Sequence, residues 1–238
     1  MCFHNALTQK PKAVAKYYGV ESSEDLYQTT PHGIGFQHPQ WPVVSMEAPH
    51  ELQLKSWGLI PTWVKQAEQA LTASNQNLNA RCETVFEKPS FRDAVKTGRC
   101  LIPSTGFFEW REMNKIKYPY FIYPTHDALF TMAGISTTWL NSETGQWQTT
   151  FSILTTEANN TLRFIHNVKQ RMPVLLSPDQ FPLWLNPQAN ELELQELFKP
   201  FADESMAYYT VNREAMKYPA LGEQAIPQWV YPEMNTLF

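Results

Sequence analysis

Short apolar runs of strand length recur along this chain, and clusters of turn-forming residues bound most of them. Segments in which apolar residues alternate or run continuously over such lengths predict β-strands. A hairpin turn is predicted at 141–145, where Asn-Ser-Glu-Thr-Gly separates two of the longer runs. Several strands at this spacing favour a mainly antiparallel sheet or a partly closed barrel. The predicted strands are 43–46, 56–61, 100–103, 118–123, 128–135, 149–155 and 207–212.

Helix-compatible spacing of apolar residues occurs in shorter segments between these runs. Ser90 is a candidate N-cap, which would place Arg92 in the first turn of a helix. Residues 21–29 fit a short helix or a polar loop, and 65–78 fit a helix or a flexible segment. We therefore predict an α+β fold with a mainly antiparallel, partly barrel-like β core and peripheral helices, in one domain over 1–238. The predicted helices are 10–18, 65–78, 90–96, 178–185 and 189–199.

The composition is that of a compact globular protein with an uneven charge distribution. Aromatic residues make up 13% and charged residues 18% of the 238 residues, which is unlike a disordered chain. The net charge of -4 gives no overall attraction to nucleic acid. Residues 79–117 nevertheless carry eight Lys or Arg against five Asp or Glu, whereas 188–238 carry three against eight. The basic segment is therefore the better candidate for binding an anionic partner.

The three cysteines, Cys2, Cys82 and Cys100, indicate neither a disulfide framework nor a zinc site, because their number is odd and no CxxC spacing occurs. A reducing cytoplasm fits this usage. The start of the chain lacks the apolar core of a signal peptide, and no later run has the length of a membrane span. His32, His38 and His50 match no metal-binding spacing, so we expect no metal and no cofactor.

The densest group of chemically active residues lies between 79 and 110. In an extended segment Asn79, Arg81 and Glu83 would point to one face, because side-chain direction repeats every two residues. Glu109 follows two phenylalanines and precedes Trp110. Apolar surroundings disfavour the charged form of a carboxyl and raise its pKa, which suits a general acid or base.

Cys2 offers two nucleophiles if Met1 is removed, because a small second residue permits that cleavage. The α-amine has a pKa of about 8 and the thiol about 8.5, so both groups would react appreciably at neutral pH. Alternatively, Cys2 is an incidental residue at a frayed terminus.

Several runs together resemble the SRAP family, whose members process abasic sites and crosslink to damaged single-stranded DNA. The similarity extends over about residues 1–185 and is specific because many motifs occur jointly. The matching runs are Trp57-Gly58-Leu59-Ile60-Pro61 with Trp63, Asn79-Ala80-Arg81 with Glu83-Thr84, Pro89-Ser90-Phe91-Arg92, Cys100-Leu101-Ile102-Pro103, Gly106-Phe107-Phe108-Glu109-Trp110, Ala133-Gly134-Ile135 with Trp139, Thr155-Thr156 with Ala158-Asn159, and Arg171-Met172-Pro173-Val174-Leu175.

The resemblance implies a covalent reaction in which Cys2 closes a thiazolidine on the aldehyde of an abasic site, shielding the lesion during the DNA damage response. Asn79 would orient the opened sugar, and Glu109 would move protons during ring closure. His166 would assist ring opening or reversal, since a pKa near neutrality suits proton transfer.

The resemblance also implies contacts with single-stranded DNA. Arg81 and Arg92 resemble family positions that contact phosphates. Trp57, Trp63 and Trp110 are candidates for stacking on unpaired bases, with a buried core position as the alternative for each of them. The implied protein is a monomer without metal or cofactor, located in the cytoplasm and at damaged DNA of the nucleoid. A peptidase or hydrolase activity, which could be limited to removal of its own Met1, and a lyase activity are the enzymatic alternatives that the resemblance implies.

The chain departs from the family pattern at two places near the expected site. It opens Met1-Cys2-Phe3-His4, where the family usually has Gly-Arg after the cysteine. Four residues, 167–170, separate His166 from Arg171, where the family commonly has one. The loop after His166 is therefore expected to be longer.

Two other classes of function compete with covalent trapping. An N-terminal nucleophile hydrolase of the glutamine amidotransferase type also begins at a cysteine, although no glycine-rich oxyanion motif is present here. A noncovalent single-stranded DNA-binding module would use the arginines and tryptophans without any chemistry at Cys2.

Overall fold

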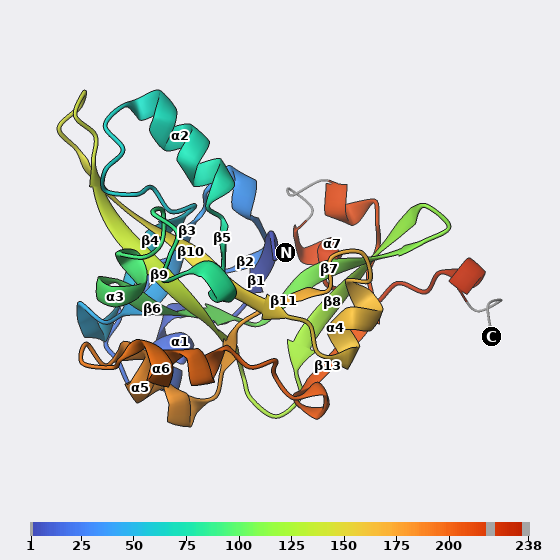
Figure 1. Cartoon of the computed structure of the whole chain (residues 1–238). Helices are drawn as coiled ribbons and strands as arrows, with labels where there is room; N and C mark the ends of the chain where they lie inside the picture. The colour runs from blue at the N-terminus through green and yellow to red at the C-terminus, as the bar shows by residue number, and fades with distance from the viewer. Residues whose placement is uncertain (1, 218–221, 235–238) are drawn as a thin grey trace.

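A closed ring of five strands forms the centre of the computed structural model, which describes residues 2–217 and 222–234 (Figure 1). Neighbours in the ring pair in the order β10, β4, β3, β6, β9, and β9 pairs again with β10. All pairs are antiparallel except β10 with β4. The five strands are β3 (Gln40–Ser45), β4 (Ala48–Trp57), β6 (Arg99–Ser104), β9 (Phe130–Leu140) and β10 (Trp147–Glu157).

A second, wholly antiparallel sheet lies beside this barrel, with strand order β13, β8, β7, β1, β2. Only Thr105 separates β6 of the barrel from β7 of the sheet, so the chain passes directly from one to the other. Figure 1 shows the start of the chain between the two sheets. The strands of the second sheet are β1 (His4–Leu7), β2 (Thr30–Ile34), β7 (Gly106–Met113), β8 (Ile116–Pro124) and β13 (Met206–Thr210).

Three short strands extend the barrel near the site described below. β5 (Asn79–Arg81) runs parallel to β10, and β11 (Arg171–Pro173) pairs with the same strand in the antiparallel sense. β12 (Leu175–Leu176) pairs with β9. The end of β10 thus has a neighbour on each side.

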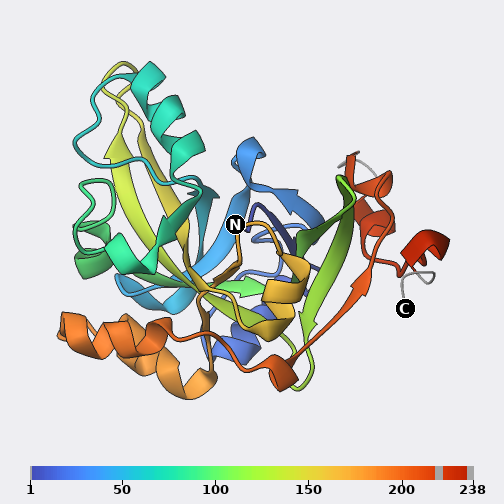
Figure 2. The same ribbon diagram turned by 45° about the vertical axis from the view of Figure 1, so that its right-hand side comes forward.

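The helices lie outside the two sheets, as Figure 2 shows for α5 and α6 below the barrel and α4 over the second sheet. None of the helices in 2–217 and 222–234 is both long and apolar enough to cross a membrane. The helices are α1 (Pro11–Tyr18), α2 (Ala67–Gln76), α3 (Ala94–Thr97), α4 (Asn160–Ile165), α5 (Phe181–Leu185), α6 (Glu191–Gln195) and α7 (Gly222–Ala225).

The predicted α+β class with a barrel-like core is confirmed, and two predicted elements are wrong. The strand predicted at 56–61 ends at Trp57, because Gly58 adopts φ 121° and turns the chain. The helix predicted from Ser90 begins only at Ala94, after hydrogen-bonded turns that include Phe91 N–H to Lys88 O. Residues 21–29 contain no helix and form the loop that the sequence left as an alternative.

Arg99 on β6 connects the barrel to helices α3 and α5 through hydrogen bonds. Its guanidinium is 1% exposed and donates to the carbonyls of Val95, Lys96, Trp184 and Asn186. The last two acceptors belong to α5 and its end, so one side chain from β6 holds α3 and α5 together. A buried cation satisfied only by carbonyls depends on keeping every one of these bonds.

Arg99→Met should lower the free energy of unfolding by about 3–5 kcal/mol, because it leaves several buried carbonyls without a donor. Arg92→Met is the control, since the Arg92 side chain is 53% exposed and should change stability by less than about 0.5 kcal/mol. Urea unfolding of both variants measures the difference. Equal stability of the two variants would show that Arg99 does not stabilise the contact of α3 and α5 with the barrel.

Candidate functional site

The pairing of β1 with β7 carries Cys2 into the interior between the two sheets. His4 lies opposite Phe108 in that pairing, and Cys2 precedes the strand by two residues. The Cys2 side chain is 0% exposed, and its carbonyl accepts a hydrogen bond from Asn79 Nδ2 at 3.0 Å. Cys2 is therefore held at β5 on one side and lies near Glu109 of β7 on the other, where the carboxylate charge affects the thiol pKa.

Glu109 is a buried carboxyl on β7 that faces an imidazole. Its side chain is 5% exposed, and Oε2 lies 3.7 Å from Nε2 of His166. Burial raises the pKa of Glu109 to about 7, against the smaller lowering effects of the Trp110 backbone bond and the Lys169 charge. Burial therefore favours the protonated form of this carboxyl.

His166 caps the C-terminal end of α4 and is held in one tautomer. Its Nδ1–H donates to the carbonyl of Arg171 at 2.9 Å, so Nε2 carries no proton in the neutral ring and faces Glu109. Burial lowers the pKa of His166 to about 4. The contact with Glu109 is therefore not an ion pair at neutral pH, because the acid holds its proton more firmly than the imidazole does.

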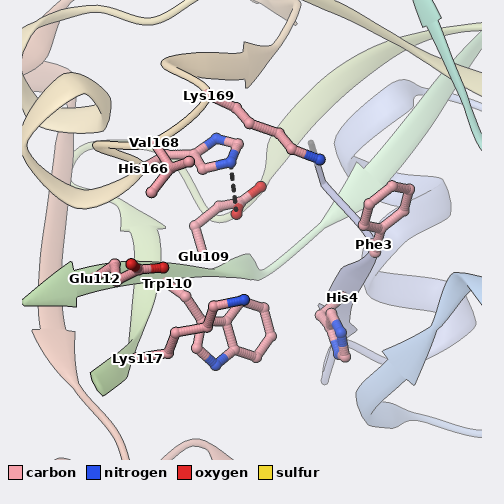
Figure 3. A pocket seen from close by; sticks show the side chains of 9 residues that line it. All are labelled: Phe3, His4, Glu109, Trp110, Glu112, Lys117, His166, Val168 and Lys169. Carbon is pink, nitrogen blue, oxygen red and sulfur yellow. Dashed lines mark ion pairs between the residues drawn. The ribbon is translucent and has the colours of Figure 1, made fainter. Parts of the chain in front are cut away.

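A pocket of about 310 Å³ opens beside this pair, and Figure 3 shows the side chains around it. Trp110 forms one wall, and the His4 ring meets it edge-on at a centroid distance of 4.6 Å. The lining residues are Phe3, His4, Glu109, Trp110, Glu112, Lys117, His166, Val168 and Lys169.

The thiol of Cys2 differs from the expectation of a group that ionises readily at neutral pH. Complete burial, assisted by the Glu109 charge, raises its pKa strongly. The expected thiol pKa of about 8.5 is therefore wrong, because that value applies to a hydrated thiol and burial disfavours the thiolate. Cys82 and Cys100 are also buried and are not disulfide-bonded.

Asn79 and Arg81 lie on β5, but Glu83 does not continue that strand. The chain turns into a 3-10 helix at Cys82, and Glu83 pairs with Arg171 through both carboxylate oxygens. The predicted common face of Asn79, Arg81 and Glu83 is therefore wrong. Asn79 Oδ1 is buried without a hydrogen-bond partner among the described residues, which leaves an acceptor beside Cys2.

The three tryptophans considered for base stacking have different environments. Trp57 is 0% exposed, packs against Trp41 and Phe151, and donates to the carbonyl of Leu78, so its ring cannot stack on a base. The prediction that Trp57 stacks on a base is wrong, because its side chain lies in the barrel core. Trp63 is 56% exposed, and Trp110 is half-buried in the pocket wall.

The structure brings four predicted residues together, namely Cys2, Asn79, Glu109 and His166, with Trp110 beside them. Arg81 is exposed on the strand of Asn79. Neither Arg92 nor Trp63 lines the pocket.

Sequence reasoning assigned no role at this pocket to several of its residues, among them His4, Lys117 and Lys169. His4 Nδ1 lies 2.8 Å from Nε2 of His32, and burial lowers the pKa of His4 to about 3, so this pair is uncharged. Within 2–217 and 222–234 no group of three or more potential ligands is arranged to hold a metal. The sequence indicated Lys169 only indirectly, because it lies in the loop 167–170, which is longer than is common in the family.

Residues 1–218 match the family described as SOS response associated peptidase (SRAP). The chain is 38% identical over 158 residues to abasic site processing protein YoaM of Bacillus subtilis (strain 168), with 66% of each protein covered. It is 30% identical over 177 residues to abasic site processing protein HMCES of Gallus gallus, covering 66% of this chain and 51% of that protein. The match thus spans slightly less than two thirds of the bacterial relative and about half of the other.

Solved structures show the same architecture. A crystal structure of a Bacteroides thetaiotaomicron protein has a TM-score of 0.92 and 38% identity, covering 96% of this chain and 100% of that one. A Bordetella bronchiseptica protein has a TM-score of 0.75 at 22% identity, over 89% of this chain and 100% of that one, and shows the fold alone.

The barrel and the adjoining sheet define an α+β protein, and its pocket is lined from the start of the chain, β7, β8 and the loop after α4. The match over residues 1–218 establishes that the chain belongs to the SRAP family.

Glu109→Gln should become more stable relative to wild type as pH rises. The raised pKa means that folded Glu109 keeps its proton between about pH 4.5 and 7 while the unfolded carboxyl loses it, so wild-type stability falls through this window. Glutamine has no carboxyl proton to lose, so the stability of the variant does not fall in this pH window for that reason. The stability difference between variant and wild type should grow by about 2–3 kcal/mol from pH 4 to pH 8.

Urea unfolding of both proteins at several pH values measures that difference. The lowered pKa values of His4, His32 and His166 act in the opposite direction, because stability falls as unfolded histidines take up protons below about pH 6.5. The contributions of His4 and His32 are common to both proteins and cancel in the difference. His166 contacts Glu109, so its pKa is measured in each protein by NMR titration and its contribution is subtracted. A difference independent of pH would mean that Glu109 titrates normally.

Proposed function

We propose that this protein recognises abasic sites in single-stranded DNA and traps them covalently through Cys2, so that the lesion is shielded. The main support for this proposal is the position of Cys2. Its carbonyl accepts a hydrogen bond from Asn79, and its thiol lies close enough to Glu109 for the carboxylate charge to affect the thiol pKa. Relatives named abasic site processing proteins support the substrate.

The reaction begins with removal of Met1, a residue that lies outside the described part of the chain. The freed α-amine of Cys2 adds to the aldehyde of the ring-opened abasic sugar, and loss of water gives an imine. The thiol then adds to the imine carbon, forming a C–S bond while its proton passes to the nitrogen. The product is a five-membered thiazolidine, and its formation from the free amine, the thiol and the aldehyde releases the one water lost at the imine step.

Glu109 and His166 suit the proton transfers that these steps require. Glu109 at a pKa of about 7 can both accept a proton from the attacking amine and donate one to the departing hydroxyl. Neutral His166 offers Nε2 as the neighbouring acceptor. Because burial holds the Cys2 thiol protonated, a nearby base is needed to take its proton during ring closure.

Asn79 is suited to orient the opened sugar. Its Nδ2 fixes the backbone of Cys2, and its buried Oδ1 is available to accept from a sugar hydroxyl or from the new ring nitrogen. Both functions use the same rigid side chain on β5.

We further propose that the DNA strand passes over the exposed side chains near β5. Arg81 lies two residues from Asn79, and Trp110 forms a wall of the pocket where an adjacent base could stack. Arg92 and Trp63 would contact the strand further from the lesion.

Cys2 variants should separate the two nucleophilic groups. Cys2→Ser keeps an amine but has a hydroxyl that closes the ring poorly, so its adducts should be few and heat-labile. Cys2→Ala should form only a reversible imine, trapped by borohydride. Glu109→Gln should bind DNA with wild-type affinity and react more slowly.

Denaturing gels and intact mass spectrometry with abasic single-stranded DNA measure these adducts. Wild-type protein should lack Met1 and gain the mass of the DNA less one water. A heat-stable adduct from Cys2→Ala at the wild-type rate would rule out the thiazolidine. Unchanged DNA protection by that variant without any adduct would favour a noncovalent binding module, and ammonia release from glutamine would favour an amidotransferase.

Arg81→Ala and Arg92→Ala should each reduce the salt dependence of single-strand binding, by about 0.7 in log–log slope for each phosphate that the variant no longer neutralises. Lys199→Ala is the control, because Lys199 is exposed, pairs with Glu196 and lies in the acidic segment. Fluorescence anisotropy at several salt concentrations gives the slopes. Wild-type slopes in both arginine variants would place the DNA path elsewhere.

A further inference from the structure

The loop between His166 and Arg171 is fixed at both of its ends. The Asn167 side chain bonds both backbone groups of Glu112 on β7, donating to the carbonyl at 2.8 Å and accepting from the N–H at 3.0 Å. At the other end Gln170 donates to the carbonyl of His166 at 2.8 Å and accepts from the N–H of Ala158 at 3.0 Å. Val168 and Lys169 thus project from a closed and anchored loop.

Lys169 extends from this loop across the pocket. Figure 3 shows its side chain reaching over His166 and Glu109 on the side toward the N-terminal strand. Its positive charge lowers the pKa of both groups, which places the ammonium within electrostatic reach of each. Lys169 forms no ion pair with any residue of 2–217 or 222–234, so its charge is available to a ligand.

The other basic side chains of the pocket are less suited to bind an anion. His4 and His166 are uncharged at neutral pH, since burial lowers their pKa values to about 3 and about 4. Lys117 lies directly opposite Glu112 in the β7–β8 pairing, so a carboxylate offsets its charge. Lys169 is therefore the pocket lysine with neither an ion pair nor a cross-strand acid among the described residues, and burial favours the protonated form of Glu109, the acid over which it reaches.

We propose that Lys169 binds a non-bridging oxygen of a phosphodiester that flanks the lesion and so positions the strand for attack by Cys2. An abasic nucleotide has no base to stack or pair, but it keeps the phosphate on each side. A cation that projects over Glu109 and His166 can therefore bind one of these phosphates at any abasic site. This inference rests on the proposed function for the identity of the anion.

Salt-dependent binding to undamaged single-stranded DNA tests the charge contact without any covalent step. Lys169→Ala should reduce the log–log slope by about 0.7, and Lys169→Arg should keep the wild-type slope. Lys115→Ala is the matched control, because Lys115 is an exposed lysine in the β7–β8 turn and is not part of the pocket lining. A wild-type slope for Lys169→Ala would overturn the proposal.

A second measurement locates the phosphate. In a Cys2→Ala background, binding is measured to abasic strands in which the phosphate on one side of the lesion is a neutral methylphosphonate. If Lys169 binds that phosphate, removing the lysine and removing the charge should weaken binding by the same factor, and the double change should add no further loss. Full additivity at both flanking phosphates would overturn the proposal.

Adduct formation by the wild-type protein separates this proposal from the function on which it rests. Normal adducts together with an unchanged slope for Lys169→Ala would refute only the role of Lys169. No adduct together with a slope that depends on Lys169 would refute covalent trapping and leave the phosphate contact supported. A borohydride-trapped adduct on Lys169 itself would show that the lysine is a nucleophile and would overturn its assignment as a phosphate ligand.

Discussion

The antiparallel register of β1 with β7 is the constraint on which the site depends. A slip of one residue would turn every side chain of β1 to the opposite face of the sheet. The register is reinforced at its far end, where buried Asn5 accepts a hydrogen bond from Ser104 and the N–H of Thr105 donates to Ala6. The same contacts that join β6, β7 and β1 therefore set where Cys2 meets Glu109.

Burial acts on Glu109 and His166 in opposite directions and reverses their usual order of proton affinity. A free glutamate loses its proton well below the pH at which a free histidine does. Here the carboxyl has a pKa of about 7 and the imidazole about 4. Burial thus favours the neutral forms of both groups, and the gain or loss of one proton places a single charge on the pair, where the facing side chain is its nearest polar neighbour.

Sequence patterns predicted the class of the fold because the barrel strands are apolar over long runs and follow strong turn signals. The Asn141–Gly145 hairpin and the buried run at 100–103 are examples. Strands β1 and β2 went unpredicted, since their short mixed sequences acquire strand structure only by pairing with β7 and with each other. Gly58 shows the complementary error, where one left-handed residue ends an otherwise strand-like segment.

The residues of the candidate site could be named from motifs, but their electrostatic states could not. Nothing in the sequence shows that Cys2 is fully buried, that Trp57 faces the core, or that Arg171 rather than a neighbour of Asn79 binds Glu83. These outcomes depend on contacts between segments far apart in the chain. The partner of a side chain across such distances is decided by topology, which a local pattern does not contain.

Arg171 joins two parts of the molecule that a motif treats separately. Its carbonyl fixes the tautomer of His166, while its guanidinium binds Glu83 and the carbonyl of Thr155 on β10. The orientation of the imidazole is thereby linked through Arg171 to β10 of the barrel. Because of this link, the position of the His166 ring depends on β10, a barrel strand that contributes no residue to the pocket lining.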